Sequence, residues 1–186
     1  MSGKIYITDD NSPDYFTLDI LTDKSNLSEF DCGIEEYNTY LRRDALQGQA
    51  EFLAVTWLLR DLNENNYVAY MAITADAIKL SVEEKTLHNL NYPFRTLPAM
   101  KIAKLAVSKT AKEKYAGIGT NMLSIASHIA RMTNGDRFAC RFLTVDADIE
   151  NDAGVTEFYR KNGFLANKAM RKKSNITINM RRDLFL

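Results

Sequence analysis

The sequence has few of the residues that build disulfide frameworks, metal sites and disordered linkers. Its 186 residues include two cysteines, two histidines and three prolines. Cys32 and Cys140 lie far apart and lack the spacing of metal ligands, so we expect no metal site and a reduced, cytoplasmic protein. Internal repeats and low-complexity segments are also missing, which leaves an ordinary globular composition.

Long apolar runs and a net charge are missing as well. No stretch approaches the ~20 apolar residues that cross a bilayer, and the N-terminus lacks the apolar core of a signal peptide. We therefore expect no membrane contact. The 24 basic and 24 acidic residues balance, yet acids prevail near the start of the chain and bases near its end. This asymmetry indicates either two solvated faces or a basic edge that meets phosphates.

Hydrophobic patterns predict strands and helices that alternate along a single domain, residues 1–186. The strands are expected at 15–22, 52–60, 66–80, 100–108, 138–146 and 175–181. Helices are expected after Asp31 as N-cap (with Ile34, Tyr37, Leu41 and Ala45 on one face), within 81–97, from Gly117 to Gly135, and from Thr156 to a stop at Gly163. This order predicts an α/β (α+β) fold with a mixed, mostly antiparallel central sheet flanked by helices.

A helix that begins with two glycines is the most informative local feature. In KEKYAGIGTNML (112–123), Gly117 and Gly119 open the helix, although glycine costs roughly 1 kcal/mol relative to alanine inside a helix. The first amides of a helix attract anions, and glycine lets phosphate oxygens approach them. The alternative is a turn that only packs the helix close to a strand. The spacing matches neither a P-loop nor a dinucleotide fingerprint.

Two motifs, in this order, resemble the GNAT superfamily of acyl-CoA-dependent N-acetyltransferases. Leu105-Ala106-Val107 and then Lys114-x-x-Gly117-x-Gly119 are similar to that family's strand followed by Arg/Gln-x-x-Gly-x-Gly/Ala. FYRKNGF, from Phe158 to Phe164, is similar to its aromatic-Tyr pair before Gly-Phe. Lys114 replaces the usual Arg or Gln, and the SKTAKEKYA loop before Gly117 is longer than usual.

The resemblance implies the GNAT fold and acetyl-CoA as the cofactor. The pyrophosphate would lie on the amides from Tyr115 to Thr120, and the pantetheine arm would pair with the backbone of Leu105 and Val107, where an N–H polarises the thioester carbonyl. Tyr159 is similar to the family's general acid for the leaving thiolate. The expected catalytic residues are Tyr159, Leu105 and Val107. The expected cofactor contacts are Leu105, Ala106, Val107, Lys112, Lys114, Tyr115, Ala116, Gly117, Ile118, Gly119, Thr120, Asn151 and Tyr159.

A general base is harder to assign from the sequence. His88 and His128 are both expected at the surface, whereas Cys140 and Phe158 are expected in the core. Asp146 and Asp148 end a strand, where acids usually cap or meet solvent. An α-amino group titrates near ~8, so a low-pKa amine needs no dedicated base, and positioning supplies most of the rate.

The segment FDCGIEEYNTYLRRDALQ is similar to the opening of the GNAT toxins of toxin–antitoxin pairs. These toxins acetylate the α-amino group of aminoacyl-tRNA and are held by a DNA-binding antitoxin. The resemblance thus implies an amine substrate, tRNA and an antitoxin as partners. The basic residues expected to contact tRNA phosphates are Lys168, Arg171, Lys172 and Lys173, with Arg42 and Arg43.

Three interpretations stay open at this point. The chain is a toxin that acetylates aminoacyl-tRNA, an acetyltransferase for a small-molecule or peptide amine, or a GNAT-fold protein that binds acyl-CoA without catalysis. The longer loop before Gly117 keeps the third interpretation open. Many GNAT proteins are homodimers, and the sequence leaves the oligomeric state open too.

Overall fold

A computed structural model describes residues 3–9, 12–91, 93–134, 138–168 and 176–185, with side chains from Phe16 onward. The chain divides into two compact units. The first unit contains the residues up to Thr74 together with Ala103–Leu123, and the second contains Ala75–Ile102 together with the residues from Ser124 on. Two strands and one helix contain residues of both units. Each unit is described by itself.

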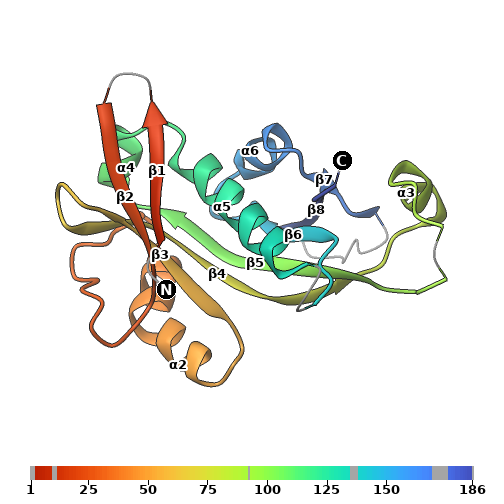
Figure 1. Cartoon of the computed structure of the whole chain (residues 1–186), viewed down its shortest axis with the longest axis horizontal. Coiled ribbons are helices and arrows are strands. Elements are labelled where there is room, and N and C mark those ends of the chain that lie inside the picture. Colours follow the sequence, from red (N-terminus) through yellow and green to blue (C-terminus); the bar gives the residue numbers. More distant parts are fainter. Residues whose placement is uncertain (1–2, 10–11, 92, 135–137, 169–175, 186) are drawn as a thin grey trace. The chain divides into compact units, whose positions relative to one another are not determined.

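Antiparallel strands form the sheet of the first unit. Its hydrogen-bonded order is β1-β2-β3-β4-β5, with β1 (Gly3–Asp9), β2 (Ser12–Ile20), β3 (Val55–Asp61), β4 (Asn66–Ile78) and β5 (Leu97–Val107). Figure 1 shows β1 and β2 as a hairpin, whose register runs from Gly3 opposite Leu18 to Asp9 opposite Ser12. The predicted β3–β4 hairpin is confirmed. The sequence analysis did not predict β1.

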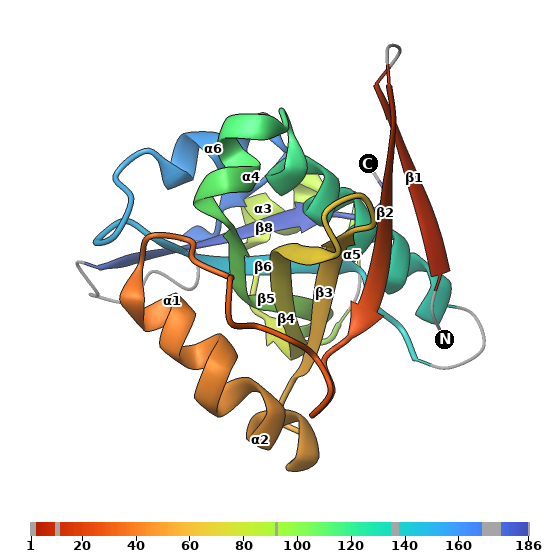
Figure 2. The same cartoon turned by 90° about the vertical axis from the view of Figure 1, so that its left-hand side faces the viewer.

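A helical segment packs against this sheet. It consists of α1 (Glu35–Thr39), a π-helical turn (Tyr40–Asp44) and α2 (Ala45–Ala50). Leu41 and Ala45 are buried in one cluster with Leu58 of β3 and Tyr70 of β4, and Figure 2 shows the segment alongside these strands. The expected apolar face is therefore confirmed. It buries side chains that would otherwise meet water, at about 25 cal/mol per Å² of apolar surface.

The start of this helix differs from the prediction. The N-cap is Ile34, in an extended conformation and without a side-chain cap, rather than Asp31. Asp31 lies further upstream, where its Oδ1 accepts from the amide of Gly33 at 2.8 Å and from Nδ2 of Asn38 at 2.9 Å. Asp31 thus closes the turn that precedes the helix.

The segment between β5 and the glycine helix is itself helical. α4 (Lys109–Lys114) has Ser108 as N-cap, whose hydroxyl accepts from the amide of Ala111 at 3.2 Å. Ala111 is buried, with 1% of its surface exposed. The long SKTAKEKYA loop is thus an ordered helical turn. The predicted helix follows as α5 (Ile118–Thr133), and its expected C-cap at Gly135 lies outside the described residues.

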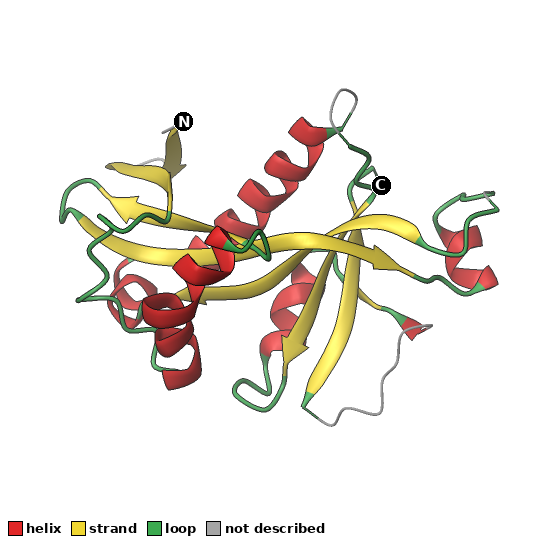
Figure 3. Cartoon of the chain, turned by 90° about the horizontal axis from the view of Figure 1, so that it is seen from below, coloured by secondary structure: helices red, strands yellow, loops and turns green. Residues whose placement is uncertain are grey.

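The second unit contains a mixed sheet. Its order is β4-β5-β6-β8-β7, with β6 (Phe142–Asp148), β7 (Leu165–Ala166) and β8 (Thr177–Asp183). β5 pairs with β6 in parallel, whereas β6–β8 and β7–β8 are antiparallel. Its helices include α6 (Val155–Lys161) and α3 (Val82–Leu87). Figure 3 shows α3 at the right, in the segment that connects the end of β4 to the start of β5. The predicted fold class, a mostly antiparallel sheet with flanking helices, is confirmed.

The ends of the second unit's elements follow local chemistry. Ser81 and Glu84 form a capping box at the start of α3: the Ser81 hydroxyl accepts from the Glu84 amide at 3.2 Å, and the Glu84 carboxylate accepts from the Ser81 amide at 2.8 Å. α6 stops at Gly163, which takes φ +80, as predicted. No helix in the described part of the chain is long and apolar enough to cross a membrane.

Candidate functional site

The end of β5 leads through α4 into the glycine turn of the first unit. Leu105 is half-buried, whereas Ala106 and Val107 are buried. The amide of Ser108 donates to the carbonyl of Val68 on β4 at 2.8 Å, which fixes the strand end to its neighbour. Leu105 and Val107, predicted to pair with the pantetheine arm, therefore lie at the end of a strand that leads directly into α4.

The turn itself requires a glycine. Gly117 has φ +78, a left-handed conformation that residues with a Cβ rarely adopt. A Cβ at this position would meet no atom within 4 Å, so the turn opens onto empty space and close packing does not explain the glycine. The sequence left open the alternative that glycine is needed only for packing the helix close to a strand. This alternative has no support at Gly117.

The first amides of α5 follow this turn. The amide of Asn121 donates to the carbonyl of Gly117 at 2.9 Å and makes the first helical hydrogen bond. By helix geometry, the amides of Ile118, Gly119 and Thr120 have no acceptor within the helix. These donors lie at the positive end of the helix dipole. Because α5 is a 16-residue helix, the turn has the chemistry of an anion site.

Tyr115 fixes the chain where it enters the turn. Its ring packs edge-on against Phe16 at a centroid distance of 5.2 Å, and its hydroxyl donates to the carboxylate of Asp61. Asp61 is 1% exposed and also accepts from the amide of Asn63 at 2.8 Å. Burial, and then the bond to Asp61, raise the pKa of Tyr115. The phenol therefore stays neutral and acts as an anchor.

The two lysines before the turn are placed differently. Nζ of Lys114 lies 2.6 Å from a carboxylate oxygen of Glu64 and 3.8 Å from Asp61, and the hydrogen bond to Glu64 raises its pKa. Lys114 is thus partly neutralised by Glu64, and its contact with the cofactor stays a prediction. Lys112 is exposed and pairs with no acid among the residues that the structure describes.

Tyr159, the predicted general acid, belongs to the second unit. It lies on α6 and is 7% exposed, with its ring edge-on to Phe158 at 5.1 Å and to Phe164 at 5.3 Å. Burial, with a smaller contribution from the charge of Asp148, raises its pKa, so the phenol is protonated at neutral pH. Phe158, expected in the core, is half-buried instead; the tyrosine takes the inward position.

Asn151 lies in the turn after β6, also in the second unit. Its Nδ2 donates to Oδ2 of Asp148 at 2.8 Å, and its amide lies 3.2 Å from Oδ1. These bonds close the turn, and the side chain is exposed. The predicted contact of Asn151 with the cofactor stays a prediction.

The histidines and Cys140 separate into buried and exposed residues. His128 is exposed, as predicted, and Cys140 is 1% exposed, where burial raises the pKa of its thiol. The prediction for His88 is wrong: it is 4% exposed and its Nδ1 lies 2.9 Å from Asp183. The polar segment around His88 favoured a surface position. The partner that accompanies its burial, Asp183, is 95 positions away, so the local sequence did not indicate it.

The basic residues predicted to contact tRNA are only partly described. Lys168 is exposed in the second unit, and Arg42 and Arg43 are exposed in the first. Arg42 donates to the carbonyl of Phe30 at 2.6 Å, which holds its guanidinium near the surface. The others, Arg171, Lys172 and Lys173, lie outside the described residues.

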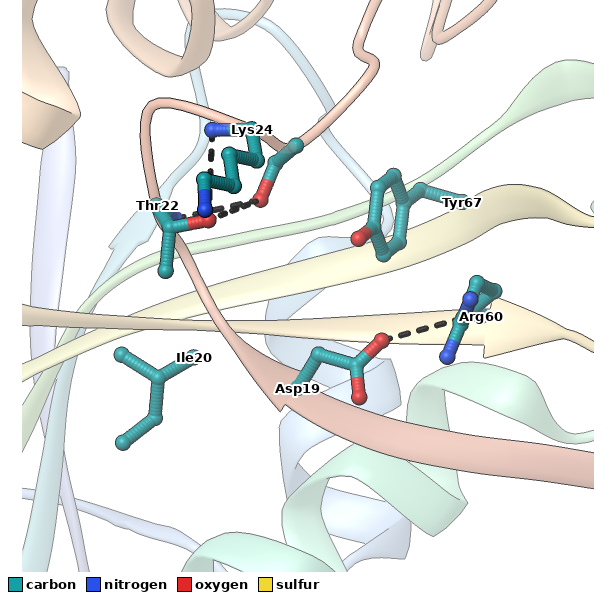
Figure 4. A pocket seen from close by; sticks show the side chains of 7 residues that line it. Asp19, Ile20, Thr22, Lys24, Arg60 and Tyr67 are labelled. Atoms are coloured by element: carbon teal, nitrogen blue, oxygen red, sulfur yellow. Dashed lines mark hydrogen bonds and ion pairs between the residues drawn. The ribbon is translucent and has the colours of Figure 1, made fainter. Parts of the chain in front are cut away.

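A pocket of about 380 Å³ in the first unit contains none of the predicted residues (Figure 4). Arg60 and Asp19 form an ion pair of 3.0 Å across it, and Tyr67 lines one side. Thr22 and Ser25 bond to each other within one turn. Its arginine is already paired, and its second cation, Lys24, is exposed. No group of three potential metal ligands occurs among the described residues.

No family model and no curated protein sequence matches this chain. Solved structures match its fold. A tyrosine-to-phenylalanine variant of KacT has a TM-score of 0.72 and 15% identity, covering 91% of this chain and 95% of that one. AtaT complexed with acetyl-methionyl-tRNAfMet has a TM-score of 0.71 and 18% identity, covering 88% and 93%. An AtaT variant bound to the C-terminus of the antitoxin AtaR and to acetyl-CoA has a TM-score of 0.67 and 17% identity, covering 91% and 93%.

KacT and AtaT are GNAT-fold toxins. At this level of identity the likeness establishes the fold of our chain, and the GNAT fold that its two motifs predicted is confirmed.

Proposed function

We propose that this chain is an acetyl-CoA-dependent N-acetyltransferase that acts as the toxin of a toxin–antitoxin pair and acetylates the α-amino group of aminoacyl-tRNA. The observation that carries the proposal is the turn at Gly117, which opens onto empty space directly before the first amides of α5. The fold supports it, because structures that share this fold contain acetyl-CoA or acetylated tRNA.

The residues of the first unit fit the cofactor. The amides of Ile118, Gly119 and Thr120 would hold the pyrophosphate, since they lack helical acceptors and lie at the positive end of α5. Backbone groups of Leu105 and Val107 would hold the pantetheine arm along β5, as in an added strand. When bound, acetyl-CoA supplies an acetyl group activated as a thioester.

The proposed role of Tyr159 is to supply a proton from its Oη to the departing thiolate. Burial keeps the phenol protonated by raising its pKa. Its hydroxyl has no hydrogen-bond partner among the described residues, so the proton is not committed to a structural bond. An aminoacyl ester has an α-amino group of low pKa, and the chain then needs to position the amine rather than to deprotonate it.

The partners follow from the same proposal. Lys168, Arg42 and Arg43 are exposed cations that would contact tRNA phosphates. An antitoxin is the expected second partner, since AtaT binds the C-terminus of AtaR. We keep the single domain of residues 1–186 and the cytoplasmic location as parts of the proposal.

The experiment that tests the proposal measures acetylated aminoacyl ends. Purified protein is incubated with labelled acetyl-CoA and total charged tRNA, and the aminoacyl ends are analysed by mass spectrometry. We expect acetylated ends that disappear with Tyr159→Phe and persist with the control variant Tyr67→Phe, a half-buried tyrosine outside the proposed site. Acetylation of small amines but not of tRNA would instead support a small-molecule enzyme. Tight acetyl-CoA binding without any transfer would support a non-catalytic binding protein.

A further inference from the structure

The second unit contains a pocket of about 450 Å³ that none of the residues predicted for acetyl-CoA lines. Its walls come from the end of α3, from α5, from the end of α6 and from β8, through His88, Ser124, Lys161–Gly163 and Arg181–Asp183. It lies where β7, only two residues long, leaves the last residues of β8 without a described strand partner on that side. The size is within the range of sites for small molecules.

Buried ionic groups make the floor of this pocket rigid. Arg181 is 2% exposed; its guanidinium nitrogen lies 2.8 Å from Oε1 of Glu84 and 3.1 Å from the carbonyl of Ala166. Nε of Arg181 also donates to Nε2 of His88 at 3.3 Å. Because arginine always donates, Nε2 of His88 is the acceptor, and the ring proton is on Nδ1.

The carboxylate of Asp183, which lines the floor, is also occupied. Oδ2 of Asp183 accepts from Nδ1 of His88 at 2.9 Å and from a guanidinium nitrogen of Arg141 at 2.8 Å, while Oδ1 accepts from the amide of Phe185 at 2.9 Å. The Asp183 side chain is 3% exposed. It therefore does not present an uncompensated negative charge to the pocket.

The rim of the pocket has two cations that lack a counter-charge. Lys161 is exposed and Arg182 is half-buried, and neither pairs with an acid in the part of the chain that the structure describes. Arg182 lies against the turn at Gly163: its Nε is 3.6 Å, and its Cδ 3.7 Å, from where a Cβ of Gly163 would be. These are ordinary contact distances, so Arg182 lies directly beside the turn. An open recess with two unpaired cations attracts an anion.

We propose that this pocket binds the terminal phosphate of a phosphomonoester. A guanidinium donates two parallel hydrogen bonds to a phosphate, and an ammonium adds a point charge. A phosphomonoester carries about −1.5 to −2 charge at neutral pH, whereas each phosphate within a strand carries one negative charge, so a pair of cations favours the terminal phosphate. Phosphorylated metabolites and 5′-phosphorylated RNA ends share this chemistry. The site is separate from the residues proposed to hold acetyl-CoA, so its test does not depend on acetyl transfer.

Calorimetry with paired probes tests the proposal. Ribose 5-phosphate is compared with ribose, and a short 5′-phosphorylated RNA with the same RNA carrying a 5′-hydroxyl. The pocket variant is Lys161→Gln/Arg182→Gln, and the control is Arg160→Gln, an exposed cation on the same helix outside the pocket. We expect the phosphorylated probe to bind, with affinity reduced about tenfold or more in the pocket variant and unchanged in the control.

The two sources of the phosphate are distinguished by which pair responds: ribose 5-phosphate indicates a metabolite, and the 5′-phosphorylated RNA indicates an RNA end. Equal affinities of wild type and pocket variant would overturn the proposal, as would binding of the 5′-hydroxyl RNA as tightly as the phosphorylated one. Failure of both phosphorylated probes to bind would overturn it too. If the double variant does not fold, Lys161→Gln alone provides the test, because that side chain is exposed and makes no ion pair with a described residue.

Discussion

Replacing Glu84 by glutamine tests whether the buried charges of the second unit stabilise it. Glu84 is 6% exposed, and its Oε1 accepts from Arg181 and, at 2.9 Å, from the amide of Lys168. Its Oε2 accepts from the amide of Ser81. Glu84→Gln keeps the shape of the side chain and one acceptor oxygen, but it removes the charge that compensates the guanidinium of Arg181.

The expected loss of stability is large. Breaking a buried ion pair by removing one partner costs about 3–5 kcal/mol, because the other charge remains buried and uncompensated. We expect the lower end, about 3 kcal/mol, since glutamine still accepts one hydrogen bond and the carbonyl of Ala166 still accepts from Arg181. With a slope of about 2 kcal/mol per M of urea, this loss moves the unfolding midpoint down by about 1.5 M.

Urea unfolding, followed by circular dichroism, measures this shift. The matched control is Glu83→Gln, because Glu83 is the neighbouring acid, is exposed, and accepts from the Ser81 hydroxyl at 2.6 Å. We expect the control midpoint to stay close to that of the wild type. The double variant Glu84→Gln/Arg181→Met should lose less than the sum of its single variants, since it leaves no lone charge. Equal midpoints for the Glu84 and Glu83 variants would refute the reasoning.

Three further predictions concern the glycine turn, Tyr159 and His88. Gly117→Ala should lose about 1 kcal/mol of stability because position 117 has a left-handed φ, and Gly117→Asn should lose less. Both variants should bind acetyl-CoA more weakly in calorimetry. Unchanged affinity in both would leave the turn without a role in ligand binding. Tyr159→Phe should lower the acetylation rate about 10²–10⁴-fold with an unchanged melting temperature. Burial and Arg181 lower the pKa of His88 from 6.5, against the opposing effect of Asp183. As the pH falls, His88 is therefore protonated in the unfolded chain before it is protonated in the folded protein. The free energy of unfolding should fall as the pH drops below 6.5 towards the lowered pKa of the folded state. The urea midpoints of wild type and His88→Asn should converge on acidification.

The sequence predicts elements where side chains repeat with a clear period, and misses elements that depend on a partner. β3, β4, β5, β6 and β8 all overlap predicted strands. β7 has two residues, too few for any period, and β1 pairs only with β2. α4 is one short helix without an apolar stripe, although Ser108 at its start is a usable N-cap signal.

The candidate site also combines a feature that local sequence predicts with contacts that it does not. The need for glycine at position 117 follows from local chemistry, and the structure agrees through a positive φ. The anchoring of Tyr115 by Asp61, and the pairing of Lys114 with Glu64, join residues 54 and 50 positions apart. No local pattern contains such pairs, because folding, and not spacing, decides which acid meets which base.

The capping box at Ser81 shows how a local signal leads into a non-local network. Its sequence pattern, a serine followed three residues later by a glutamate, is typical of exposed helix starts, and this makes the surrounding polar segment look solvated. Here the same glutamate uses its second oxygen for Arg181, 97 positions away, so α3 is fixed to β8 and His88 is buried with it. The cations on the pocket rim, Lys161 and Arg182, take no part in these bonds. Stability and phosphate binding should therefore separate: variants of Glu84 change unfolding, whereas variants of Lys161 change the affinity for phosphate without changing the unfolding midpoint.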